Sequence, residues 1–151
     1  MHTKSILHNP RQNSVTVQRA VRGPPAASRL RGWARAAVGG KVAVTLRVVG
    51  AAEGRRINRA FRARDSATNV LSFGYGLRPL HGDIVLCHPV IAREARQQGK
   101  SLAAHYAHLV VHGMLHLRGY DHDRPDSAAR MERAEIRILR GLGLGNPYTV
   151  E

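Results

Sequence analysis

The stretch SLAAHYAHLVVHGMLHLRGYDH, residues 101–122, combines a strong helix pattern with five of the nine histidines of the chain. Ser101 can cap a helix, because a serine hydroxyl accepts a hydrogen bond from a backbone N–H of the first turn. Apolar residues then recur at helical spacing through Tyr106, Val110 and Leu117, until Gly119, a residue type that commonly ends helices. We therefore expect a central helix capped by Ser101 and ended before Gly119.

Three histidines near the end of this helix have the spacing of a metal site. His112 and His116 are four residues apart, so their imidazoles project from one helix face. Gly119 can turn the chain sharply, and His122 follows just beyond that turn. Three neutral imidazoles suit Zn²⁺ and leave its fourth position open for water, the arrangement of a catalytic zinc site. We predict one zinc ion per chain, at the C-terminal end of the central helix.

The spacing H-x-x-x-H-x-x-G-x-x-H also occurs in zinc peptidases, which carry a glutamate directly after the first histidine as general base. Gly113 stands at that position here and can transfer no proton. A peptidase would therefore lack its main catalytic group. Asp121 could accept a proton or orient a ligand, and Asp83 is a weaker candidate because we expect it to begin a strand. A histidine-rich helix end that binds no metal is the alternative.

The remaining histidines of this helix, His105 and His108, lie on other turns. We expect them to be paired or exposed side chains and not metal ligands.

The net charge of +14 is unevenly distributed, which favours a polyanionic partner, with nucleic acid ahead of a membrane. Residues 1–82 contain 15 Lys or Arg and two acids, whereas residues 83–151 contain nine and eight. Two alternatives need no nucleic acid: the arginines could be a solvated surface, or they could reflect the base composition of the genome. No stretch reaches the roughly 18 apolar residues of a membrane span. The single cysteine, Cys87, excludes an internal disulfide and fits a reducing compartment.

Patterns elsewhere in the chain predict a single domain over residues 14–151, preceded by a flexible tail at residues 1–13. We expect strands at 15–18, 41–49, 68–75 and 83–87, and a loop broken by glycine and proline at 74–82. Helices are expected from Pro24 to about residue 38, at 51–62, at 89–98, and from a cap at Asp126 or Ser127 to residue 140. Apolar side chains expected to be buried are Trp33, Ile57, Phe61 and Cys87. Phe73, Tyr75 and Tyr120 are candidate platforms for stacking bases.

The segment His112–His122 carries the signature H-G-x-L-H-L-x-G-Y-D-H, and in this the sequence resembles the YbeY family of bacterial rRNA maturation factors. Further blocks that resemble the family follow in the same order: residues 58–62 with Asp65, residues 68–73 and residues 82–87, then residues 105–106 and 131–132. Gly74 departs from the family, which usually has proline there. The resemblance implies an α+β fold in which a small mixed sheet packs with several helices.

By this resemblance the chain is a metal-dependent endoribonuclease specific for single strands, and His112, His116 and His122 are its zinc ligands. Arg62 matches the family's functional arginine. A guanidinium there can grip a phosphate through two hydrogen bonds and offset charge that develops during cleavage. Arg59, on the same predicted helix, is expected to bind substrate beside it. The catalytic candidates are thus Arg62 and Asp121.

The resemblance further implies maturation of the 16S rRNA 3′ end and ribosome quality control in the cytoplasm. The implied partners are the 16S rRNA precursor and the small ribosomal subunit with its proteins, with no membrane. Two other functions stay open. The chain could be a non-catalytic ribosome-assembly factor in which zinc only pins the turn to the helix, or a zinc hydrolase of substrates other than RNA.

Overall fold

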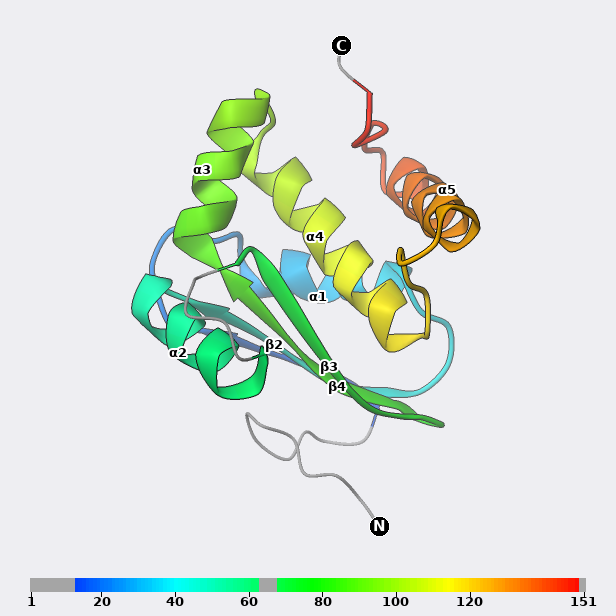
Figure 1. Ribbon diagram of the computed structural model, residues 1–151, viewed down its shortest axis with the longest axis horizontal. Helices are drawn as coiled ribbons and strands as arrows, with labels where there is room; N and C mark the ends of the chain where they lie inside the picture. The colour runs from blue at the N-terminus through cyan, green and yellow to red at the C-terminus, as the bar shows by residue number, and fades with distance from the viewer. Residues whose placement is uncertain (1–12, 63–67, 150–151) are drawn as a thin grey trace.

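The computed structural model describes residues 13–62 and 68–149, apart from the side chain of Arg62 (Figure 1). Within these residues the chain forms four strands and five helices. In chain order they are β1 (Ser14–Arg19), α1 (Ala27–Ala36), β2 (Val42–Val49), α2 (Ala51–Arg62), β3 (Val70–Leu77), β4 (Leu80–Cys87), α3 (His88–Gln98), α4 (Leu102–Leu117) and α5 (Pro125–Gly141).

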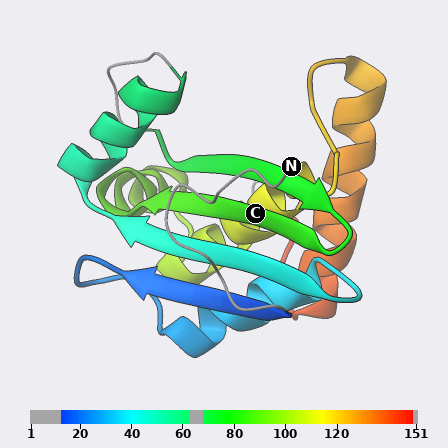
Figure 2. The same ribbon diagram turned by 90° about the horizontal axis from the view of Figure 1, so that it is seen from below.

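The strands form one mixed sheet in the order β1-β2-β4-β3, as Figure 2 shows from one edge to the other. Strands β1, β2 and β4 are parallel, and β3 lies antiparallel to β4 at the edge. Parallel neighbours need a crossover connection, and α1 and α2 provide the two that this order requires. The α+β fold with a small mixed sheet, predicted from the sequence, is confirmed.

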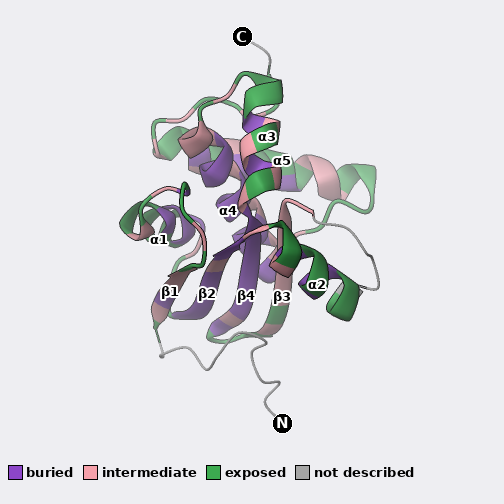
Figure 3. Cartoon of the chain, turned by 90° about the vertical axis from the view of Figure 1, so that its left-hand side faces the viewer, coloured by how far each residue is buried: buried purple, intermediate pink, exposed green. Residues whose placement is uncertain are grey.

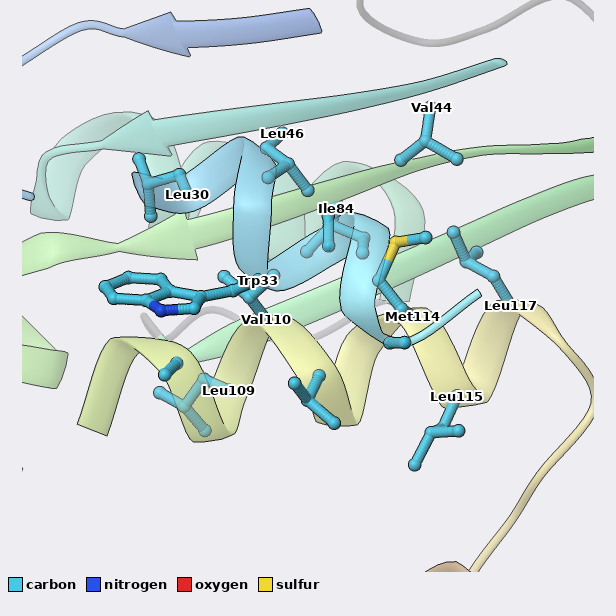
Figure 4. Packing of buried hydrophobic residues seen from close by; sticks show 14 of the residues in the cluster. Leu30, Trp33, Val44, Leu46, Ile84, Leu109, Val110, Met114, Leu115 and Leu117 are labelled. Atoms are coloured by element: carbon cyan, nitrogen blue, oxygen red, sulfur yellow. The ribbon is translucent and has the colours of Figure 1, made fainter. Parts of the chain in front are cut away.

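Helix α4 packs across one face of the sheet and is the central helix that the sequence predicts (Figure 1). Its cap is the expected one: the hydroxyl of Ser101 accepts a hydrogen bond from the amide of Ala104 at 3.0 Å. Val110 and Met114 are fully buried in the same cluster as Ile84 of β4 (Figure 4). Helices α1, α3 and α5 contact the remaining sides of α4. Despite its apolar character, neither α4 nor another described helix is long and apolar enough to cross a bilayer.

A smaller cluster lies on the opposite face, where α2 packs against β2 and β4. Ile57 of α2 contacts Val49, Val85 and Cys87, and Cys87 is buried as predicted. Phe61 was expected to point inward, but 52% of its surface is exposed. Helix α2 reaches the sheet only through its earlier turns, so its outer face stays in solvent (Figure 3).

The predicted loop at residues 74–82 is wrong. Strand β3 continues to Leu77 and β4 begins at Leu80, so only two residues form the turn of a hairpin. The glycines that suggested a loop lie inside the strands, and the register shifts between Gly74 and Gly76. A glycine within a strand often marks such a bulge or the close approach of another group.

Two further expectations concern the ends of the domain. Helix α5 begins earlier than predicted, with Arg124 as its cap and Pro125 in the first turn. Ser127 is not the cap residue but lies at the third position of the helix, where its hydroxyl accepts a hydrogen bond from the backbone amide of Arg124 at 3.3 Å and so completes a capping box. Asp126 lies in the first turn. The predicted tail falls outside the described residues except for Asn13, whose backbone carbonyl accepts a hydrogen bond from Arg35.

Gly82 lies where α4 approaches the sheet closely enough to leave no space for a Cβ atom. A Cβ atom there would lie 2.7 Å from the backbone oxygen of Phe73 and 2.7 Å from a methyl group of Leu117. Gly82→Ala should therefore lower the free energy of unfolding by about 1–3 kcal/mol, because the strand and α4 must move apart. Gly76→Ala is the matched control, since a Cβ atom there meets no neighbour within 4 Å. Urea unfolding measures both, and equal midpoints for the two variants would contradict the close packing.

Candidate metal centre

Gly119 turns the chain at the end of α4, as the sequence predicted, and so brings His122 back to the helix. Its φ of +98° is a left-handed conformation that glycine adopts without strain. The amide of Gly119 donates to the carbonyl of His116, and the amide of Tyr120 donates to that of Leu115, each at 3.0 Å. This pair of hydrogen bonds is a Schellman motif, which fixes the direction in which the chain leaves a helix.

The turn gathers His112, His116 and His122 into one cluster. The ring centroids are 4.7 Å apart for His112 and His116, 5.1 Å for His116 and His122, and 5.7 Å for His112 and His122. One ring nitrogen of each lies within 4.8 Å of the others, close enough for all three to bind one ion. Burial and the two neighbouring histidines lower the pKa of His116, which favours the neutral imidazole that a metal requires. The donor set therefore fits zinc.

A buried carboxylate, Glu135 of α5, supports the cluster from behind. Glu135 is fully buried, and one of its oxygens lies 2.5 Å from Nδ1 of His112. The other oxygen lies 3.1 Å from Nε2 of His108 and accepts a hydrogen bond from the hydroxyl of Tyr148. Burial alone would raise the pKa of this carboxyl, but the hydrogen bonds from His108, His112 and Tyr148 lower the pKa of Glu135 to about 2. Glu135 is thus ionised at neutral pH.

Glu135 is a functional residue that was not predicted from the sequence, although the sequence carries a signal for it. Met131, Ala134, Ile138 and Leu139 form the apolar stripe of α5, and Glu135 lies within that stripe. A charged residue on the buried face of an amphipathic helix needs a partner, because unpaired charges are rarely buried. The histidines of α4 were the available partners.

The three histidines form one wall of an open cleft with a volume of about 510 Å³. Residues 69–72 and Gly74, at and just before the edge strand β3, form the other wall. None of the described residues that line this cleft is an aspartate or glutamate. Gly113, which occupies the position of the peptidase glutamate, faces the sheet instead of the cleft. A Cβ atom there would lie 3.1 Å from Ile84 and 3.2 Å from the hydroxyl of Ser72.

The two candidate bases lie in different surroundings. Asp121 follows the Gly119 turn and is fully exposed; hydrogen bonds from Ser127 and from the amide of Asp123 lower its pKa. Asp83 was expected to begin a strand, but it lies inside β4 and is fully buried. Neighbouring strand residues alternate between faces, and Ile84 packs in the α4 cluster, so Asp83 points to the opposite face from the histidines. There it accepts a hydrogen bond from Tyr75 at 2.9 Å.

The predicted substrate-binding arginines belong to α2. Arg59 is exposed on this helix, which packs on the opposite face of the sheet from α4. Arg62 is the last residue of α2, and its side chain lies outside the described part of the chain. The start of α2 is anchored by Glu53, whose two oxygens accept hydrogen bonds from Arg47 of β2 at 2.6 and 2.9 Å. The described residues therefore fix the position of α2 but do not show either arginine in the histidine cleft.

The aromatic candidates for base stacking have partners within the protein. Phe73 lies edge-on to the exposed ring of Phe61, with centroids 5.7 Å apart. Tyr75 contacts His81, and Tyr120 lies below the guanidinium of Arg118. Phe61 and Phe73 thus form the more accessible aromatic pair, next to the arginines of α2.

The second pair of histidines behaves as expected from the sequence. His105 is buried, and its Nε2 lies 2.9 Å from a carboxylate oxygen of Glu94 on α3. That carboxylate also accepts a hydrogen bond from the side-chain amide of Asn69, a residue of the cleft wall. His108 pairs with Glu135 as described above. Both histidines are therefore paired side chains.

Comparisons with known proteins identify the family of this chain. The family profile described as Endoribonuclease YbeY matches residues 28–143. The chain is 54% identical over 141 residues to endoribonuclease YbeY of Aromatoleum aromaticum, covering 89% of this chain and 92% of that protein. It is 51% identical over 128 residues to endoribonuclease YbeY of Nitrosomonas eutropha, covering 84% and 91%. The solution structure of TM1509 from Thermotoga maritima has the same fold, with a TM-score of 0.54 at 22% identity, covering 90% of this chain and 99% of that one. With a family match over most of its length and relatives at about 50% identity, the chain belongs to the endoribonuclease YbeY family.

Proposed function

We propose that this chain is a zinc-dependent endoribonuclease that cleaves single-stranded RNA, and that it matures the 3′ end of 16S rRNA and acts in ribosome quality control. The observation that carries the proposal is the convergence of His112, His116 and His122 on one open cleft, in a chain of an endoribonuclease family. Its partners are the 16S rRNA precursor and the small ribosomal subunit with its proteins, in the cytoplasm.

Zinc is the metal that best suits three imidazole donors beside an open cleft. When bound, it would act as a Lewis acid and lower the pKa of a water molecule to about 7. His112, His116 and His122 would hold it, and each must be neutral to do so. The support of His112 by Glu135 agrees with this assignment, because histidines that bind metals commonly donate their second ring N–H to a carboxylate.

The polypeptide's own groups have the remaining tasks. Arg62 neutralises charge that develops on the phosphate oxygens, and Arg59 holds the RNA backbone beside it. Asp121 accepts a proton near His122. The positive charge of residues 1–82 attracts RNA without reading its sequence, so binding should weaken steeply with salt.

His116→Ala should abolish zinc binding and RNA cleavage together, because it removes one of three ligands. The measurements are zinc content by atomic emission and cleavage of a single-stranded RNA with and without chelator. We expect about one zinc per wild-type chain, the ratio of a three-histidine site.

His81→Gln is the control, since His81 is a histidine of β4 outside the cleft. Zinc in the wild type without any cleavage, even on isolated small subunits, would support an assembly factor instead. Cleavage of peptides but not RNA would support a different hydrolase.

Arg62→Ala should lower RNA cleavage by at least about tenfold at unchanged zinc content, because it removes charge stabilisation and no ligand. Arg133→Ala is the control, because Arg133 is an exposed arginine of α5 and its substitution removes the same positive charge from the chain. Cleavage rates at several salt concentrations separate a catalytic effect from weaker binding. Equal rates for the two variants would exclude a catalytic role of Arg62.

Asp121→Asn should lower cleavage by about 100-fold, the usual contribution of a general base, while zinc remains bound. The asparagine keeps an oxygen that can accept the hydrogen bond from the amide of Asp123, so the turn is preserved. Because the pKa of Asp121 is lowered by its hydrogen bonds, the carboxylate is ionised at neutral pH, and the two rates are compared there with zinc content measured alongside. An unchanged rate would assign Asp121 to the turn alone.

A further inference from the structure

We propose that Glu135 is the positioning residue of the metal centre: it holds the ring of His112 in one tautomer and one orientation, and Tyr148 locks Glu135 in place. The role of Glu135 at a zinc site rests on the proposed function, whereas the hydrogen bonds of Glu135 are observed independently of it. Neither Glu135 nor Tyr148 belongs to the three-histidine set.

The protonation of the network follows from its donors and acceptors. An ionised carboxylate accepts hydrogen bonds and donates none. Glu135 is fully buried, and its two oxygens lie within hydrogen-bonding distance of His112, His108 and Tyr148. Each partner must therefore donate, so His112 carries its proton on Nδ1. When the ring is neutral, as metal binding requires, Nε2 then carries no proton and can bind a metal.

Both oxygens of Glu135 are already occupied by this network. One accepts from His112, and the other accepts from His108 and Tyr148. His108, His112 and Glu135 could by distance alone hold an ion of their own. Nδ1 of His108 is buried without a hydrogen-bond partner among the described residues, so the contact of this ring with Glu135 is made through Nε2 alone. We therefore assign this group to positioning, and a second zinc is the outcome that would contradict it.

Tyr148 reaches Glu135 because the chain after α5 is held against α3 and α4. The ammonium group of Lys100 donates to the carbonyl of Pro147 at 2.7 Å, and the amide of Tyr148 donates to the side chain of Asn146 at 2.8 Å. The ring of Tyr148 also packs edge-on against His108, with centroids 5.3 Å apart. A segment 26 residues beyond His122 in sequence thus contributes to the support of a ligand.

The experiment compares Glu135→Gln, Tyr148→Phe and wild type in zinc affinity and in the ring-nitrogen NMR shifts of His112. Zinc affinity is measured by competition with a chromophoric chelator. Glu135→Gln removes the charge but keeps the shape, and should weaken zinc binding by about 10- to 100-fold. Tyr148→Phe removes one hydroxyl from a half-exposed ring and should weaken zinc binding by less than about tenfold. Tyr148→Phe leaves the buried packing intact, so it tests the proposal even if Glu135→Gln fails to fold. Glu132→Gln, an exposed acid on the same helix, is the matched control.

The NMR shifts provide a readout that needs no metal. In the zinc-free wild type, Nδ1 of His112 should be protonated and Nε2 should not, and Glu135→Gln should mix the two tautomers. If wild type and both variants bind zinc equally, the positioning role is overturned and the zinc site stands. If the tautomer is as expected but wild type binds no zinc, the proposed function fails and the ring orientation stands. Two zinc ions per wild-type chain would overturn the positioning role in favour of a second metal site.

Discussion

The close contact between α4 and the β3–β4 hairpin is the constraint on which the rest of this structure depends. Where the helix crosses the strands, a Cβ atom on Gly82 would overlap with Leu117, and a Cβ atom on Gly113 would lie tightly against Ile84. Each fully buried side chain of this size contributes about 1.5–3 kcal/mol. The contact also places the end of α4 beside the edge strand, so the cleft that contains the histidines is a direct consequence of core packing.

An almost completely buried helix that carries several histidines requires partners for them. Burying a polar group without a hydrogen bond costs about 1–3 kcal/mol. Two of the neighbouring helices supply a carboxylate: Glu94 of α3 accepts from His105, and Glu135 of α5 accepts from His108 and His112. His116 and His122 face the cleft without a carboxylate partner among the described residues. His105 and His108 are thus paired with carboxylates, His112 is paired through Nδ1 alone, and the rings of His112, His116 and His122 each keep a nitrogen close enough to the others to bind one ion.

The central helix, its cap at Ser101 and the turn at Gly119 could be predicted because each follows from local chemistry. A serine cap, a helical repeat and a left-handed glycine need no knowledge of the remaining fold. The hairpin could not be predicted in the same way, because Gly82 is explained by Leu117, 35 residues later in the sequence. Phe61 was misplaced for a similar reason: the periodicity of α2 indicates an apolar face, but not where the sheet beneath it ends. Glu135 was missed because its partners lie on another helix.

Gly113 connects packing with chemistry. In zinc peptidases the residue after the first histidine supplies the general base, but here that position faces the sheet, where a Cβ atom would lie 3.1 Å from Ile84 and 3.2 Å from Ser72. A glycine at this position gives the closest approach of the helix to the sheet without such tight contacts. The same feature that stabilises the fold therefore excludes a peptidase-type base, and no described acid lines the cleft to replace it. Under the proposed function, proton transfer is therefore assigned to Asp121, which is adjacent in sequence to His122, and stabilisation of charge on the phosphodiester is assigned to the arginines of α2.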